Sequence, residues 1–248
     1  MGYGETSSQI RILPAGSYVP FFIARKAGRV GDSEPLRKAT DVAAFELDIA
    51  PITNQRFLEF VRKNREWSRS RIAAVFADES YLKHWRSDYS LKRRAERDQP
   101  VTHVSWFAAA AYCHSQGKEL PTTDQWEYAA KDAGRHADEI VKQNLSWYGS
   151  PNPQSLAPIK QQAPNGYGIY DFYGLVWEWT LDFNSSMIGS ELRGDGTKDD
   201  NLFCGAGSLN ALDSTDYANF MRYSFRSSLR ANYTTANLGF RCARGGEK

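Results

Sequence analysis

The feature that most constrains the fold is a series of three motif-rich blocks, which lie at residues 100–130, 166–179 and 237–242. The first block predicts two consecutive helices. Tryptophan, alanine and cysteine residues follow Ser105 at helical intervals until Gly117, and Thr122 or Thr123 can cap the second helix. The other two blocks, GYGIYDFYGLVWEW and NLGFRC, combine glycines with large aromatic residues. From residue 141 onward we therefore expect long loops and short strands.

The amino-terminal part adds strands and one more helix. Residues 10–22 are β-rich, and residues 45–49 alternate apolar and acidic side chains as a strand does. Thr53 or Asn54 can cap a helix that follows. The apolar face of that helix is expected to consist of Phe57, Leu58, Phe60 and Val61.

In this order, the three blocks resemble the formylglycine-generating enzyme (sulfatase-modifying factor) family, and the resemblance runs from about residue 45 to residue 244. It implies an α+β fold, a large variant of the C-type-lectin-like fold with much irregular structure. The sequence has no internal repeat, low-complexity tract or Pro/Gly/Ser-rich linker. We therefore expect residues 45–244 to form one family-type domain, and residues 1–44 to be an extension with the first strand, part of the same domain.

The segment that carries the family's chemistry lacks the expected cysteines. The family's enzymes use a cysteine pair before the last motif to bind copper and activate oxygen, but residues 205–226 contain no cysteine. The two positions fall near Ala211 or Asp213 and near Ala218. None of these side chains supplies the thiolate that selects Cu(I). The sequence therefore predicts neither copper binding nor formylglycine generation, and the catalytic residues stay unknown.

Other redox chemistry has little support. Related sulfoxide synthases hold iron with histidines that come partly from an extra helical domain, and the residues before position 45 are too few to form one. No two of the four histidines are spaced i, i+4, and His103 is interpreted as structural. We therefore do not expect iron. If other chemistry has replaced copper, the acid or base candidates are Asp213, Asp216 and Tyr217.

The resemblance implies one disulfide, between Cys113 and Cys242. It would favour an oxidising compartment, and thus a periplasmic or exported protein whose signal was removed. The alternative is two buried thiols in the cytoplasm. The first residues, MGYGETSSQI, lack the basic and apolar regions of a secretory signal. Cys204 is expected to be a buried, inert thiol.

The resemblance also implies a calcium site in one turn. It assigns as ligands the side chains of Asp171 and Glu178 and the backbone carbonyls of Gly174 and Val176. Calcium prefers several oxygen ligands, which a short turn can direct to one point. The alternative is an aromatic-rich turn in which Glu178 bonds to backbone donors.

Residues of the family's substrate groove are retained. By resemblance, Trp177, Ser208 and Asn237 line the groove, and Arg226 falls at a family arginine. Trp177 could equally be a core residue. Retained groove residues without the two thiols indicate a groove that still binds something, or one whose chemistry was replaced.

Charge and hydropathy exclude two classes of partner. The 31 basic and 29 acidic residues nearly balance, which gives no electrostatic reason to expect nucleic acid. No apolar run approaches the roughly 18 residues of a membrane span. The basic stretch at residues 83–97 is interleaved with acidic residues and is read as a solvated loop.

Three functions remain open. Residues 203–229 and 171–184 resemble a bacterial branch of accessory proteins from copper nitrite reductase clusters, which favours a maturation or accessory factor that binds a protein or peptide partner. The second is an oxidase or tailoring enzyme of the pyoverdine-maturation type, which would act on a small molecule. The third is a ligand-display protein on the C-type-lectin-like scaffold. Fold analogy alone does not choose among them.

Overall fold

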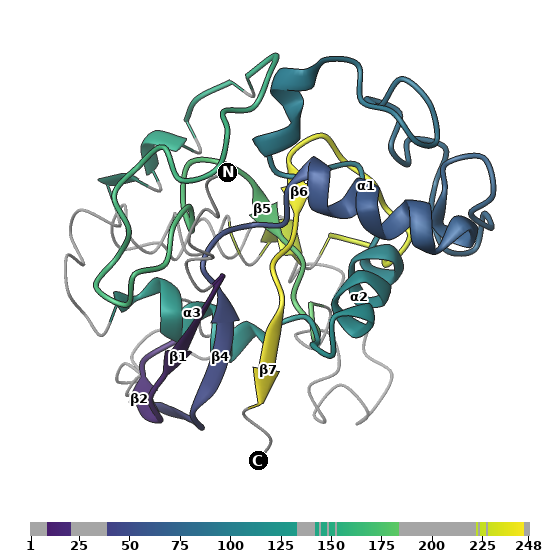
Figure 1. Ribbon diagram of the computed structural model, residues 1–248. Helices are drawn as coiled ribbons and strands as arrows, with labels where there is room; N and C mark the ends of the chain where they lie inside the picture. Colours follow the sequence, from purple (N-terminus) through teal and green to yellow (C-terminus); the bar gives the residue numbers. More distant parts are fainter. Residues whose placement is uncertain are drawn as a thin grey trace, which may run out of the picture.

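The computed structural model describes residues 9–20, 39–132, 142–143, 145–147, 149–151, 153–183, 222, 224–226 and 228–245. The largest sheet in these residues has three antiparallel strands in the order β1-β4-β7. β4 (Phe45–Asp48) is central, between β1 (Ile10–Leu13) and β7 (Ala243–Gly245). The first and last described segments therefore lie in one sheet (Figure 1). A second sheet pairs β2 (Gly16–Tyr18) with β3 (Thr40–Val42).

The helices begin where the capping residues predict. Their bounds are α1 (Asn54–Lys63), α2 (Trp106–Ser115) and α3 (Thr123–Ala130), with short 3-10 helices η1 (Arg65–Trp67) and η2 (Arg94–Asp98). Thr53, Ser105 and Thr122 each accept a backbone N–H of the first turn through the side-chain hydroxyl. Gly117 follows α2 with φ of +65°, a conformation that glycine adopts without strain.

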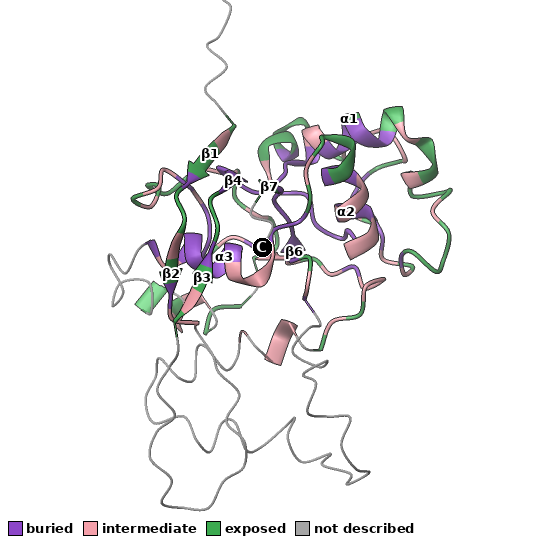
Figure 2. Cartoon of the chain, turned by 90° about the horizontal axis from the view of Figure 1, so that it is seen from below, coloured by how far each residue is buried: buried purple, intermediate pink, exposed green. Residues whose placement is uncertain are grey.

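Two clusters of buried side chains form the core. The larger one lies around α1 and α2, where Phe57 stacks on Tyr112 and meets the edge of Phe240. The smaller one joins β1 and β4 to α3, and includes Leu47 and Trp126. In Figure 2, β4, β6 and α3 are mostly buried, whereas β1, β2 and β3 carry more exposed residues. Helices, short strands and much irregular chain confirm the predicted α+β class.

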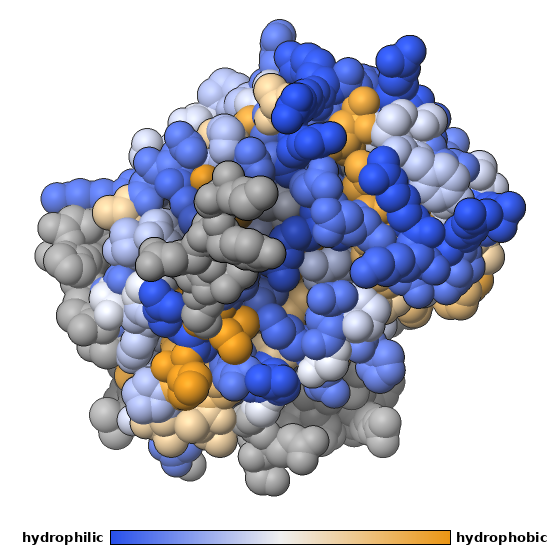
Figure 3. Space-filling view, in the orientation of Figure 1, coloured by the Kyte–Doolittle hydropathy of each residue, from blue (hydrophilic) through white to orange (hydrophobic). Residues whose placement is uncertain are grey.

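The visible surface is mainly hydrophilic, with small separated apolar spots (Figure 3). The large apolar side chains that are exposed in the described part of the chain are Ile12, Val75, Phe76 and Leu181. No helix within that part is long and apolar enough to cross a membrane.

Candidate functional site

The site is built where the second and third motif blocks meet. β5 (Trp177–Glu178) and β6 (Leu238–Gly239) pair in parallel, and the Trp177 N–H donates to the Asn237 carbonyl at 2.7 Å. A Cβ at Gly239 would lie 2.8 Å from the Val101 carbonyl oxygen. Only glycine therefore lets β6 pack this closely against the chain before α2.

A buried ion pair fixes the two motifs beneath the site. Arg241 donates from Nε and Nη2 to the two carboxylate oxygens of Glu178, each at 2.7 Å, and both side chains are 0% exposed. Trp126 Nε1 donates to the same carboxylate at 2.9 Å, and Arg241 Nη2 also reaches the Tyr170 carbonyl at 3.0 Å. The Glu178 carboxylate thus links all three blocks. Glu178 is bonded by side chains, whereas the alternative to a calcium site expected it to bond to backbone donors.

The turn predicted to bind calcium surrounds Asp171. This residue has φ of +59°, and its Oδ2 accepts the Lys160 N–H at 2.6 Å. Burial raises the pKa of the Asp171 carboxyl, and the nearby Glu178 raises it further, while the Lys160 N–H and Arg241 lower it. A buried carboxyl with a raised pKa is one that a cation would stabilise in its charged form.

The fit to calcium is uneven across the predicted ligands. Asp171 is buried, and the surrounding positive charge and hydrogen-bond donors do not offset the cost of burying its carboxylate. Gly174 has φ of +86°, which the turn requires. Glu178, by contrast, already accepts three hydrogen bonds, so it could give an ion at most a shared oxygen. The described residues contain no group of three or more His, Cys, Asp or Glu side chains placed to hold a metal. Calcium therefore stays a prediction that depends on Asp171 and on backbone carbonyls.

An aromatic cleft lies next to β5. Trp177 is half-buried, and its ring centroid lies 5.0 Å from that of Trp147 and 4.4 Å from that of Phe225. On the α3 side, the Arg222 guanidinium lies 3.8 Å from the Trp126 ring centroid. The free space at the centre is about 30 Å³, room for about one or two water molecules.

Charged groups close one end of this cleft. Arg226 Nη1 lies 3.7 Å from Glu127 Oε1, and burial lowers the pKa of Arg226. The Tyr18 hydroxyl donates to Asp124 at 2.7 Å, with Glu127 3.5 Å away. Burial, chiefly, and the adjacent carboxylates raise the pKa of Tyr18, so this hydroxyl stays protonated. The end of the cleft therefore offers a carboxylate and a guanidinium, and the Tyr18 hydroxyl lies next to the carboxylate without lining the cleft.

The structure brings together some of the predicted groove residues. Trp177 and Arg226 both line the cleft, whereas Trp179 is fully buried core. Asn237 adjoins the cleft through its backbone, and its side-chain oxygen accepts a hydrogen bond from Thr235 at 3.1 Å. Four further candidates lie outside the described residues, and these are Ser208, Asp213, Asp216 and Tyr217.

Several cleft residues were not predicted. The sequence placed Trp126 and Glu127 only in a helix, and no motif marked Trp147 or Phe225 as cleft residues. Their roles depend on contacts between distant segments, which single-sequence spacing does not encode. The available signal was the aromatic content around residue 225.

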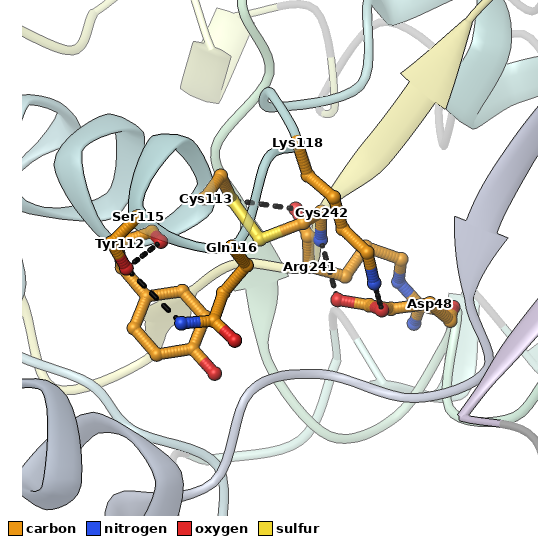
Figure 4. The surroundings of a disulfide bond; sticks show 8 residues. All are labelled: Asp48, Tyr112, Cys113, Ser115, Gln116, Lys118, Arg241 and Cys242. Atoms are coloured by element: carbon orange, nitrogen blue, oxygen red, sulfur yellow. Dashed lines mark hydrogen bonds and ion pairs between the residues drawn. A yellow bond between two sulfur atoms is a disulfide. The ribbon is translucent and has the colours of Figure 1, made fainter.

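The predicted disulfide is present between Cys113 on α2 and Cys242, with Cα atoms 5.5 Å apart. Figure 4 shows its surroundings: the Cys242 N–H donates to Asp48 at 3.1 Å, and Lys118 pairs with the same carboxylate. Both cysteines are 0% exposed. The bridge therefore ties α2 to the end of the third block, and its two sulfurs are not thiols.

The family profile of the sulfatase-modifying factor enzyme 1-like domain matches residues 6–245. The formylglycine-generating enzyme of Streptomyces coelicolor is 32% identical over 287 residues, which cover 96% of this chain and 90% of the relative. A Bos taurus protein named inactive C-alpha-formylglycine-generating enzyme 2 is 30% identical over 288 residues, which cover 99% of this chain and 90% of that protein.

Two solved structures share the fold. CarF aligns with a TM-score of 0.50 and 15% identity, covering 96% of this chain and 98% of its own. PvdO from Pseudomonas aeruginosa aligns with a TM-score of 0.50 and 18% identity, covering 95% of this chain and 93% of its own. With the family profile spanning nearly all of the sequence, the chain belongs to the formylglycine-generating enzyme (sulfatase-modifying factor) family.

Proposed function

We propose that this protein is an accessory or maturation factor that binds a protein or peptide partner in the cleft around Trp177, and that it does not generate formylglycine. The observation that carries the proposal is the number of cysteines left outside the disulfide. The chain has three cysteines, and the bridge between Cys113 and Cys242 leaves only Cys204. One remaining thiol cannot provide the pair that the family's oxygen chemistry uses.

The shape of the cleft supports peptide recognition. Trp177 is covered by Trp147 and Phe225, rings that an incoming aromatic side chain could replace at little cost because it would restore the same stacking. Arg222 and Arg226 border the same space. Tryptophan and arginine dominate the energetically important residues of protein interfaces. Relatives include a protein named as inactive as well as active enzymes, and this fits a family member with a non-catalytic role.

The disulfide supports an oxidising compartment for this activity, such as the periplasm or the exterior of the cell. Buried disulfides persist where thiol-reducing systems are absent. We further propose that the turn at Asp171 binds calcium, with the carbonyls of Gly174 and Val176 as additional ligands. The ion would supply positive charge beside a buried carboxylate and so hold the floor of the cleft rigid.

Site-directed crosslinking tests the partner proposal. A photoreactive amino acid at Leu229, which lines the cleft, should capture one defined partner under native conditions. The same amino acid at the exposed Val75 is the matched control. The account predicts that Trp177→Ala removes the product at position 229. Equal products at both positions, or a product unaffected by this substitution, would contradict it.

A second function is favoured by one observation, the carboxylate of Glu127 beside Arg226 in the cleft. A tailoring enzyme that acts on a small molecule could use this pair for proton transfer. Turnover of a small substrate that is lost in Glu127→Gln, together with an absence of captured protein, would favour this enzyme over the accessory role. Binding of a small ligand without turnover would favour ligand display.

A further inference from the structure

Two histidines that do not line the cleft meet beside the larger core. His84, in the loop after α1, stacks on His103, which precedes α2, with ring centroids 5.2 Å apart and planes inclined by 30°. Their segments are joined by the Leu82 N–H, which donates to the His103 carbonyl at 2.9 Å. His103 is 7% exposed and has φ of +52°. The fold therefore brings together two histidines whose spacing in the sequence does not predict a pair.

In each histidine ring, the proton is assigned to Nε2. His84 Nε2 lies 3.1 Å from Asn54 Oδ1, while the amide nitrogen of Asn54 faces backbone carbonyls, including that of Glu96 at 3.0 Å. Asn54 Oδ1 is therefore an acceptor, and His84 Nε2 carries the proton. For His103, the Thr234 backbone acts to raise the pKa, which favours a ring N–H directed at that backbone. Because Nδ1 has no partner, we assign this N–H to Nε2.

The other nitrogen of each ring is left without a donor. Both Nδ1 atoms are buried and have no hydrogen-bond partner. Since each Nε2 holds the proton, each Nδ1 presents a lone pair. Buried polar atoms are nearly always satisfied, so two unpartnered nitrogens in neighbouring rings need a partner that supplies positive charge or hydrogen.

A metal ion meets that requirement better than the protein's own groups do. Histidine ligands in metal sites typically donate the distal N–H to a carbonyl or amide oxygen, as His84 does to Asn54 Oδ1. Two nitrogens bound to one ion at ordinary lengths are separated by at most about 4 Å. The ring centroids are 5.2 Å apart, a spacing compatible with two Nδ1 atoms that share one ion. Imidazole nitrogens suit zinc, copper, nickel and iron.

We propose that His84 and His103 bind a late first-row transition-metal ion through their Nδ1 atoms. Water, or a donor from another molecule, would complete the coordination from the side of His84, which is partly exposed. The site is separate from the cleft and from the turn at Asp171. By fixing the loop after α1 to the chain before α2, the ion would clamp two segments that pack on the core.

Calorimetric titration with zinc tests the proposal, using the full chain with its disulfide intact and excess calcium to occupy any carboxylate site. We expect one ion per chain and a loss of affinity of about 100-fold or more in His84→Gln, which keeps an Nε2 donor for Asn54 but lacks Nδ1. His103→Asn tolerates the positive φ and should show the same loss. The exposed His114→Gln is the matched control and should bind as the unmodified protein does.

Two results would overturn the proposal. One is the absence of stoichiometric binding by the unmodified protein, which would leave a buried water as the partner of the two Nδ1 atoms. The other is unchanged affinity in both His84→Gln and His103→Asn, with circular dichroism showing that these variants are folded. If neither variant folds, the electron paramagnetic resonance spectrum of the copper(II)-loaded unmodified protein decides. Coupling to two imidazole nitrogens supports the site, and its absence contradicts it.

Discussion

Arg241 and Glu178 form a two-point ion pair with both side chains fully buried, and this pair joins the NLGFRC block to the WEW block. Two charges removed from water stabilise a fold only if both keep their partners. Each buried charge therefore requires the other, and substitution of either residue leaves its partner's charge uncompensated.

Glu178→Gln should lower the free energy of unfolding by about 3 to 5 kcal/mol, because the Arg241 guanidinium would remain buried without a counter-charge. Urea unfolding followed by tryptophan fluorescence measures this. Arg244→Ala is the control, since the Arg244 and Glu46 pair is largely exposed and should contribute at most about 1 kcal/mol. Similar losses in the two variants would contradict the structural role assigned to the buried pair.

The disulfide should contribute strongly to stability because its cysteines are 129 residues apart in sequence. In the chain-entropy model, a closed loop of this length stabilises the folded state by about 5 kcal/mol. Cys113→Ser combined with Cys242→Ser should lose most of that, as should reduction of the unmodified protein. Thermal unfolding with and without reductant is the measurement, and Cys204→Ser is the control that should behave as the parent does. Insensitivity to reductant would show that the bridge does not form.

The direction of the pKa shift of Asp171 provides a test of calcium binding. Its folded pKa is raised above the ordinary value of 3.8, so its charged form is disfavoured by folding. Without calcium, its contribution to stability should become less favourable as the pH rises from that ordinary value through the raised one. In EDTA, Asp171→Asn should therefore be at least as stable as the parent at pH 7.

With calcium in about hundredfold excess over its dissociation constant, the parent should gain about 2.7 kcal/mol of stability. Asp171→Asn should gain far less, whereas the exposed Asp41→Asn should gain as much as the parent. Thermal shift assays in EDTA and in calcium compare the three proteins. An equal calcium response in all three would place the ion elsewhere or nowhere.

Phe225→Ala should open the cleft, because it removes the ring whose centroid lies 4.4 Å from that of Trp177. Apolar cavities of this kind bind small aromatic molecules. Indole should therefore bind the variant, as measured by calorimetry, and bind the parent and the exposed Phe76→Ala variant much more weakly. Equal binding to all three would show that Phe225 does not cover the cleft.

Local signals in the sequence were enough to predict where the helices begin. Thr53, Ser105 and Thr122 sit before runs of helical periodicity, and a capping hydroxyl acts within one turn. The two-residue strands β5 and β6 carry no periodicity of their own and exist because of the partner across the pair. The α+β class and the family followed from the three blocks together.

The candidate site was predictable only in part. Trp177 and Arg226 were identified by resemblance, and the structure places both in one cleft. Phe225 and Trp147 reach this cleft through contacts across many residues of sequence, which a single sequence cannot reveal. The same reason hid the meeting of His84 with His103, whose rings are brought together by the loop after α1.

The central claim is that this chain lacks the dithiol needed for copper-dependent oxidation. The most direct test incubates the purified, disulfide-intact protein with copper, oxygen and a sulfatase-derived cysteine peptide, and measures aldehyde by mass spectrometry. The account predicts one titratable thiol per chain and no aldehyde above the level of a protein-free control. Aldehyde formation at the rate of an active family enzyme assayed alongside would contradict it.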